Sequence, residues 1–208
     1  MTRALPLIGI LAVVLFVVAG AIAGEIPDVD DPVAEVAEFY TENDSDQVTG
    51  AILLMFAAVA FLCWSIQMRA ALLAGEGGAA SRTTLGFAGT VVFAIGVAIQ
   101  AGLAISLGEA ADDLDPAAVQ ALHALSVNMF PPLAVGMFLS LLGYGLAIVS
   151  TGVLPRWLGY VAVAGALFAI TPVWFVPLFV LMVVILVSSV VLAMRAGPTA
   201  PSPAADRS

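Results

Sequence analysis

The chain has no lysine, one cysteine and one histidine, and charged residues make up only 10% of its 208 positions. With six arginines as its only cations, it lacks the basic surface of a nucleic-acid-binding protein. Cys63 has no second cysteine to pair with, and its apolar neighbours predict a packing role rather than a reactive thiol. A metal site needs three or four ligands, so His123 alone predicts a solvated or packed histidine.

Catalytic motifs are also missing. The sequence has no paired cysteines, no His-Glu helix motif, no phosphate-binding loop and no Ser-His-Asp order. The long apolar stretches contain no Asp, Glu, Arg or His of the kind that marks a proton or ion path. We therefore expect no enzyme, no cofactor and no proton-coupled transporter.

What the chain has in excess is apolar surface. Apolar residues make up 62% of it and the mean hydropathy is +1.12, whereas soluble domains average about 45–50% apolar residues. The apolar runs are about 20 residues long and do not alternate with a period of two, which favours spanning helices over a β-barrel. The predicted fold class is all-α: a polytopic transmembrane helix bundle of about six spans.

Residues 1–195 are predicted to form this single bundle, and the Pro-, Ala- and Ser-rich residues 196–208 a disordered cytoplasmic tail. The spans cover about residues 5–24, 48–68, 85–107, 129–150, 157–170 and 175–194. The last two come from one apolar stretch that would be about 57 Å long as a single helix, against a bilayer core of about 30 Å. Pro172 and Pro177 break that stretch into a hairpin, and its first arm is marginal in length for a full span.

Charge predicts the orientation. Cytoplasmic loops of membrane proteins are enriched in Lys and Arg, and six spans place every arginine on one side: Arg3, Arg69, Arg82, Arg156, Arg195 and Arg207. Nine carboxylates lie in the loop 25–47 and four in the loop 108–128, so 13 of the 15 are on the other side. We expect a multi-pass protein of the plasma (cytoplasmic) membrane with both termini in the cytoplasm.

The first apolar stretch has a second interpretation. Arg3, the apolar run after it and the small residues Ala21 and Ala23 also fit a secretory signal peptide. Cleavage after Ala23 would leave five spans with an external N-terminus, and the arginine pattern would still be obeyed. The stretch has the full length of about 20 residues of a true span, which favours an uncleaved first helix.

Both acidic loops are predicted to contain a short amphipathic helix over the outer ends of the spans. Asp31-Pro32 and Asp115-Pro116 combine a favoured N-cap residue with a favoured first helical residue. After the first pair, apolar residues recur at helical spacing as far as Tyr40, and after the second pair as far as Leu125.

The acidic face has two interpretations. Simple solvation of the carboxylates is one, and weak Ca²⁺ or Mg²⁺ binding by oxygen ligands is the other. The candidate cation contacts are Glu35 and Glu38, three residues apart on one helix, and Asp112, Asp113 and Asp115 at a helix start.

Within the spans, scattered Ser, Thr and Gln side chains predict hydrogen bonds between helices or back to their own helix, and glycines in the third and fourth spans predict close helix packing. We expect a non-enzymatic membrane protein that binds a partner, lipid or small ligand at its acidic outer face. Beyond the lipid bilayer, its partner would be another membrane protein or a second copy of the chain. A small-solute transporter that acts as an oligomer is the alternative.

The segment Leu154-Pro155-Arg156-Trp157-Leu158-Gly159, at the start of the fifth span, resembles a recurring feature of a family of uncharacterised polytopic membrane proteins common in actinobacteria. Phe39-Tyr40 with Asn43, ahead of the second span, is similar as well. The resemblance implies six spans and a plasma-membrane location, and it implies no catalytic residue. Physically, the segment is typical of a turn with a cytoplasmic arginine and an interfacial tryptophan.

Overall fold

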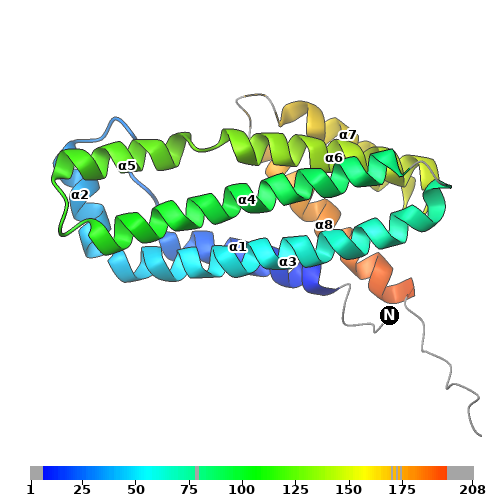
Figure 1. The fold of residues 1–208 in the computed structure, drawn as a ribbon, viewed down its shortest axis with the longest axis horizontal. Helices are drawn as coiled ribbons and strands as arrows, with labels where there is room; N and C mark the ends of the chain where they lie inside the picture. The colour runs from blue at the N-terminus through cyan, green and yellow to red at the C-terminus, as the bar shows by residue number, and fades with distance from the viewer. Residues whose placement is uncertain (1–6, 78–79, 170, 172, 174, 196–208) are drawn as a thin grey trace, which may run out of the picture.

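The computed structural model describes residues 7–77, 80–169, 171, 173 and 175–195. Over these ranges the chain is all-α, as predicted, with no β-strand. The helices in chain order are α1 (Ile8–Ala23), α2 (Val33–Glu42), α3 (Asp44–Glu76), α4 (Ser81–Ala110), α5 (Pro116–Asn128), α6 (Pro131–Thr151), α7 (Arg156–Phe168) and α8 (Phe175–Arg195). They form an elongated bundle in which the long helices run side by side (Figure 1).

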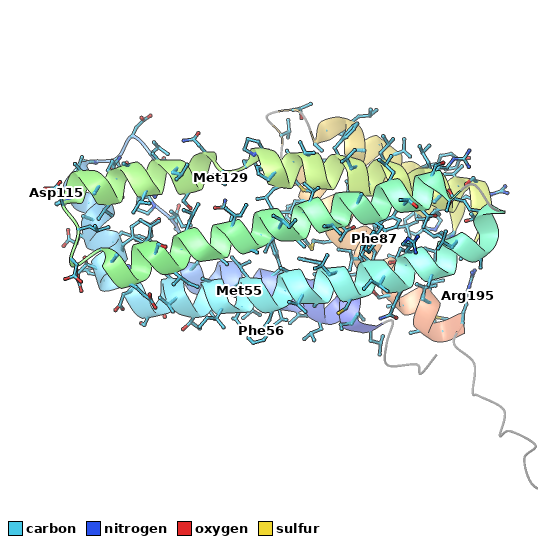
Figure 2. The ribbon with its side chains drawn as sticks, viewed as in Figure 1. Met55, Phe56, Phe87, Asp115, Met129 and Arg195 are labelled. Carbon is cyan, nitrogen blue, oxygen red and sulfur yellow. The ribbon has the colours of Figure 1, made fainter. Side chains whose placement is uncertain are left out.

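Four helical stretches in the described part of the chain are long and apolar enough to cross a membrane. They are α3, α4, α8 and the stretch that joins α5 to α6, while α1 and α7 are shorter apolar helices. Large apolar side chains cover their outer surface: Phe56 is 60% exposed and Phe179 is 69% exposed (Figure 2 shows Phe56 at the edge of α3). Apolar exposure on this scale indicates a membrane protein, because soluble monomers rarely carry such patches.

The helices lie where the spans were predicted, and α3 and α4 extend well beyond the predicted bounds. α3 has 33 residues and α4 has 30, or about 50 and 45 Å at 1.5 Å per residue. Hydropathy detects only the apolar centre of such a helix, so the polar turns at both ends were missed. The predicted break lies between α7 and α8, but Pro177 belongs to the first turn of α8 rather than to the break. Ile170 and Pro172, like Leu5 at the predicted start of the first span, lie outside the described residues.

A helix follows each of the two Asp-Pro pairs as predicted, but only one pair has the predicted N-cap. The Asp115 carboxylate accepts a hydrogen bond of 2.9 Å from the backbone N–H of Ala117, and Pro116 is the first residue of α5. The prediction is wrong for Asp31, because its carboxylate instead accepts from the backbone N–H of Asp28 at 2.7 Å. Asp31 thus closes a turn before α2, and Pro32 takes the N-cap position.

α5 does not lie across the outer ends of the spans, where the sequence predicted it. α5 continues along the direction of α6 after a short break (Figure 1). Only Met129 and Phe130 are non-helical between the two. Pro131 and Pro132 open α6, where their missing N–H groups cost nothing, and they end the ladder of hydrogen bonds from α5.

Glycines bring α4 and α6 into close contact, as their positions in the sequence predicted. A Cβ atom on Gly143 would overlap the backbone nitrogen of Gly86, and one on Gly89 would overlap that of Ser140. A Cβ atom on Gly136 would overlap the backbone of Phe93. The two backbones can approach this closely only because these positions carry no side chain.

The two ends of the bundle carry opposite charge (Figure 2 shows Asp115 and Arg195 at opposite ends). Arg82 and Arg156 lie at the starts of α4 and α7, and Arg195 ends α8. We call this the arginine end. Arg3 and Arg207 lie outside the described residues. The other end holds α2, α5 and the segment 24–32, which together we call the cap.

Candidate functional site

The cap has its own small apolar cluster, separate from the main core of the bundle. α2, α4 and α5 meet around five buried residues: Val36, Tyr40, Leu107, Ala111 and Val119. Val36 and Tyr40 lie one turn apart on α2, at the spacing that the sequence predicted for its apolar face. This cluster therefore holds the two cap helices against the end of α4.

A buried hydrogen bond joins the two cap helices. The hydroxyl oxygen of Tyr40 lies 3.0 Å from Nδ1 of His123, and the two rings are 5.8 Å apart. His123 is completely buried and Tyr40 is 3% exposed. Of the two expectations for the only histidine, solvated or packed, the packed one is correct.

Burial determines the protonation of both partners. Burial raises the pKa of Tyr40 to about 12, so the hydroxyl keeps its proton and can donate it to Nδ1. Burial also lowers the pKa of His123, against the opposing influence of the backbone of Asp28 and Pro27 and of the Asp31 carboxylate. Burial thus favours the neutral ring. When Tyr40 donates to Nδ1, the ring hydrogen lies on Nε2, a buried atom that makes no hydrogen bond in the structure.

Two amide side chains fasten the segment 24–32 to the helices around it. The Nε2 group of Gln120 on α5 donates to the carbonyl oxygen of Val29 at 2.7 Å. The Nε2 group of Gln47 on α3 donates to the carbonyl oxygen of Ala23, the last residue of α1, at 2.8 Å. Gln47 is 2% exposed although it lies close to the acidic start of α3. The connection from α1 to α2 is therefore held at both ends by side chains that the sequence did not single out.

Next to the cap lies a cavity of about 390 Å³, which we call the cap cavity. Its volume falls within the range of about 300–1,000 Å³ of small-molecule sites. α1, α3 and α4 contribute most of its wall, and α5, α6 and α8 contribute one residue each. The lining residues are Phe16, Ala19, Gly20, Ala23, Gly24, Ile26, Gln47, Gly50, Ala51, Leu54, Val97, Gln100, Ala104, Ser126, Leu133 and Leu178.

The cap cavity combines apolar walls with a few neutral polar groups. Only Gln47, Gln100 and Ser126 bring polar side chains, and no charged residue lines it. Ser126 donates a hydrogen bond of 3.3 Å to Oε1 of Gln100, which links α5 to α4. Part of the wall is open, because an added Cβ atom on Gly20 would meet nothing within 4 Å. A chain-like apolar molecule with a neutral polar end matches this lining.

The predicted cation contacts do not form a ligand cluster. Glu35, Glu38, Asp112, Asp113 and Asp115 are all exposed, and Asp115 is already used to cap α5. Among the described residues no three His, Cys, Asp or Glu side chains come together at a metal-sized spacing.

Several polar residues inside the bundle pair with each other across helices, which is one of the two predicted arrangements, while Ser106 bonds back to its own helix. Oγ1 of Thr90 lies 2.9 Å from Oγ of Ser140, and Oγ of Ser65 lies 2.5 Å from the hydroxyl of Tyr144. Nε1 of Trp64 donates to Oγ of Ser188 at 3.1 Å. These pairs connect α3, α4, α6 and α8, and they combine no nucleophile with a general base.

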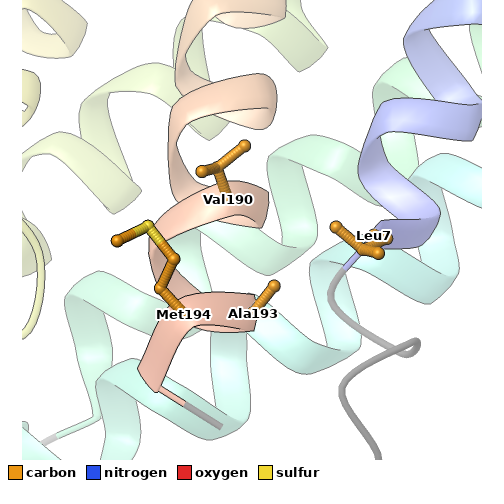
Figure 3. Close-up of a pocket in the computed structure, with 4 residues that line it drawn as sticks. All are labelled: Leu7, Val190, Ala193 and Met194. Atoms are coloured by element: carbon orange, nitrogen blue, oxygen red, sulfur yellow. The ribbon is translucent and has the colours of Figure 1, made fainter.

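A second hollow lies at the arginine end, between the start of α1 and the last turns of α8. Figure 3 shows Leu7 across from Val190, Ala193 and Met194. All four side chains are apolar, and Met194 is 78% exposed. Without a polar group to orient a ligand, this hollow has the character of an ordinary lipid-facing surface.

The sequence missed both main features of the site. Tyr40 and His123 were placed on the two loop helices, but no pattern showed that they face each other. The cap cavity is formed by small residues on several helices, and alanine or glycine at such positions is equally typical of tight packing. No protein-family model, no curated protein and no solved structure matches the chain.

Proposed function

We propose that the chain is a six-span protein of the plasma membrane, with α1, α3, α4, α6, α7 and α8 as its spans. The arginine end then faces the cytoplasm and the cap faces the other side, in accordance with the positive-inside rule. With 13 residues, α7 is about 20 Å long, which is short of the bilayer core and suits a tilted or partial crossing next to α8.

Within this arrangement, we propose that the protein is a non-enzymatic binding protein for a neutral, single-chain amphiphile. The cap cavity carries the proposal, because its apolar wall is open beside Gly20 and its polar groups are amides and a hydroxyl. The cavity volume of about 390 Å³ lies within the range of small-molecule sites, and its open wall lets the end of a longer chain extend into the bilayer.

The polar head group of the ligand, rather than its apolar chain, is expected to determine which molecule binds. A chain that enters from the bilayer leaves one apolar environment for another, so its transfer brings little hydrophobic gain. Selectivity must then come from packing and from hydrogen bonds to Gln47, Gln100 and Ser126. Glu25 and Asp46 neighbour lining residues in the sequence, and their negative charge would repel an anionic head group.

The lining also weighs against the alternative of a small-solute transporter. Transporters place polar or charged groups near the middle of the bilayer and often use broken helices there. The cap cavity has apolar walls, and its polar groups lie on residues near the cap. A lipid-like ligand therefore fits it better than a hydrated solute.

The test is native mass spectrometry of the detergent-purified protein with added monomyristoyl glycerol, compared with myristate as the charged form of the same chain. We expect one bound monomyristoyl glycerol, at least about tenfold preferred over myristate. Gly20→Phe should reduce this binding about tenfold or more, because the ring occupies the open part of the cavity.

Gly102→Phe is the matched control. Gly102 is an exposed helical glycine with open space around an added Cβ atom, like Gly20, but it does not line the cavity. Its substitution should leave binding unchanged within about twofold. Equal binding by the wild-type protein and both variants would mean non-specific annular lipid and would overturn the proposal.

A further inference from the structure

His123 lies where the cap is held together. Its Nδ1 faces the hydroxyl of Tyr40 on α2, and its Nε2 is buried without a partner. One turn further along α5, Ser126 lines the cap cavity and bonds to Gln100 on α4. A movement of α5 away from α2 would therefore also displace Ser126, the residue that α5 contributes to the wall of the cavity.

The ends of α5 allow such a movement. The helix is followed by the non-helical residues Met129 and Phe130, and then by Pro131 and Pro132. Residues 112–114 form a turn before it. Between these two points α5 is held by the small cap cluster and by the side-chain bonds of His123, Gln120 and Ser126. Hinges are typically a few residues at the ends of such an element.

We propose that α5 is a lid on the cap side of the cavity, whose wall is already open beside Gly20, and that His123 holds this lid closed, so that acidification on the cap side of the membrane opens a second side of the cavity. The importance of the lid for a ligand depends on the proposed function, but the opening itself does not. Protonation would reverse the bond, because the Tyr40 hydroxyl oxygen can accept from Nδ1. The cost is the charge itself, which would lie on a ring that no solvent reaches.

The groups around the ring set the direction of the pH effect. α2 presents the hydroxyl of Tyr40, the segment 24–32 presents the Asp31 carboxylate and the backbone of Asp28 and Pro27, and α4 presents apolar Leu107 to the cap cluster. Burial outweighs Asp31, so the pKa of His123 is lower in the closed cap than in an open one, where it is about 6.5. The closed cap is therefore most stable above about pH 6.5 and loses stability as the pH falls below that value.

The experiment measures the distance between α2 and α5 by pulsed electron spin resonance in nanodiscs, without added ligand. Spin labels are placed at Ala34→Cys and Ala121→Cys, both exposed positions, in a Cys63→Ala background. We expect one distance at pH 8 and a second, longer one whose population rises at least about threefold between pH 7 and pH 5. Labels at Ile95→Cys on α4 and Val135→Cys on α6 should report no change.

His123→Asn provides the decisive comparison, because asparagine keeps a neutral polar group near Tyr40 but does not titrate. It should hold one distance distribution from pH 8 to pH 5. An unchanged distance in the wild-type background, or opening of His123→Asn over the same range, would overturn the proposed role of His123. If His123→Asn does not fold, the pH midpoint of cap opening in the wild-type background is the second criterion. Carboxylates titrate near pH 4. Opening that occurs only below about pH 5 would therefore also overturn the proposed role of His123.

The two proposals fail separately. A pH-independent cap would leave the lipid-binding comparison of Gly20→Phe with Gly102→Phe unaffected. Loss of the lipid-binding result would likewise leave the distance measurement intact, because no ligand is present in it.

Discussion

The contact between α4 and α6 and the contact between α2 and α5 use the same helical geometry in opposite ways. At the first, glycines let the two backbones touch. At the second, a tyrosine and a histidine keep the backbones apart and meet through one hydrogen bond. The first contact depends on shape along several turns, and the second depends on one polar pair beside a small apolar cluster.

This difference predicts different responses to perturbation. A glycine contact has no protonation state and cannot open at one point without separating two long helices. The cap has fewer buried apolar residues, lies at an end of the bundle and includes a buried histidine whose pKa is lowered by burial. Elements with few buried contacts open at lower free-energy cost than the core. The rigid part of the molecule is thus its spanning bundle, and the adjustable part is the cap.

The largest effect should come from Gly143→Leu in the bundle. Its side chain would collide with the backbone of Gly86, and neither helix can move without disturbing several other contacts. Overpacking of this kind costs about 1–3 kcal/mol, and more where backbone must shift, so we expect about 3 kcal/mol or failure to fold. Unfolding in detergent should show it, with Gly102→Leu as a tolerated control. Full stability of Gly143→Leu would show that the α4–α6 contact is looser than described.

A smaller and local effect should follow from Tyr40→Phe. The ring remains, but Nδ1 of buried His123 loses its donor, which costs about 1–3 kcal/mol. Hydrogen exchange at constant pH should accelerate about tenfold in α2 and α5 and stay unchanged in α4 and α6. Tyr160→Phe on α7, where the tyrosine is 61% exposed, should change neither. Uniform acceleration across all helices would contradict a separately opening cap.

The smallest effect should come from Thr90→Val. It removes the bond from Thr90 to Ser140 while the shape of the side chain is nearly kept. Hydrogen bonds between membrane helices contribute about 0.6 kcal/mol on average, so the free energy of unfolding should fall by about that amount. Ser106→Ala is the control, since that exposed serine bonds only to its own helix, at Gly102. A loss above about 2 kcal/mol would contradict the view that the glycine contact, rather than this polar pair, contributes most of the stability of the α4–α6 contact.

The sequence predicted the bundle well because lipid makes apolar length a direct signal. The places of the long helices, the break between α7 and α8 and the close α4–α6 contact followed from hydropathy, proline and glycine. The cap was harder, since Asp31 and Asp115 have the same neighbour in sequence but bond differently. The cap cavity was not predictable, because Gly20, Ala51 and Ala104 line it only through the way that α1, α3 and α4 come together.

The most direct test of the account is to find where a neutral amphiphile lies on the protein. A monoacylglycerol with a photoreactive diazirine in its chain would be irradiated with the protein in nanodiscs, and the modified residues mapped by mass spectrometry. We predict modification concentrated on cavity-lining residues such as Ala23, Leu54 and Ala104, and lost in Gly20→Phe but not in Gly102→Phe. Modification spread over lipid-facing residues such as Val59 and Phe179, equal in all three proteins, would contradict the account.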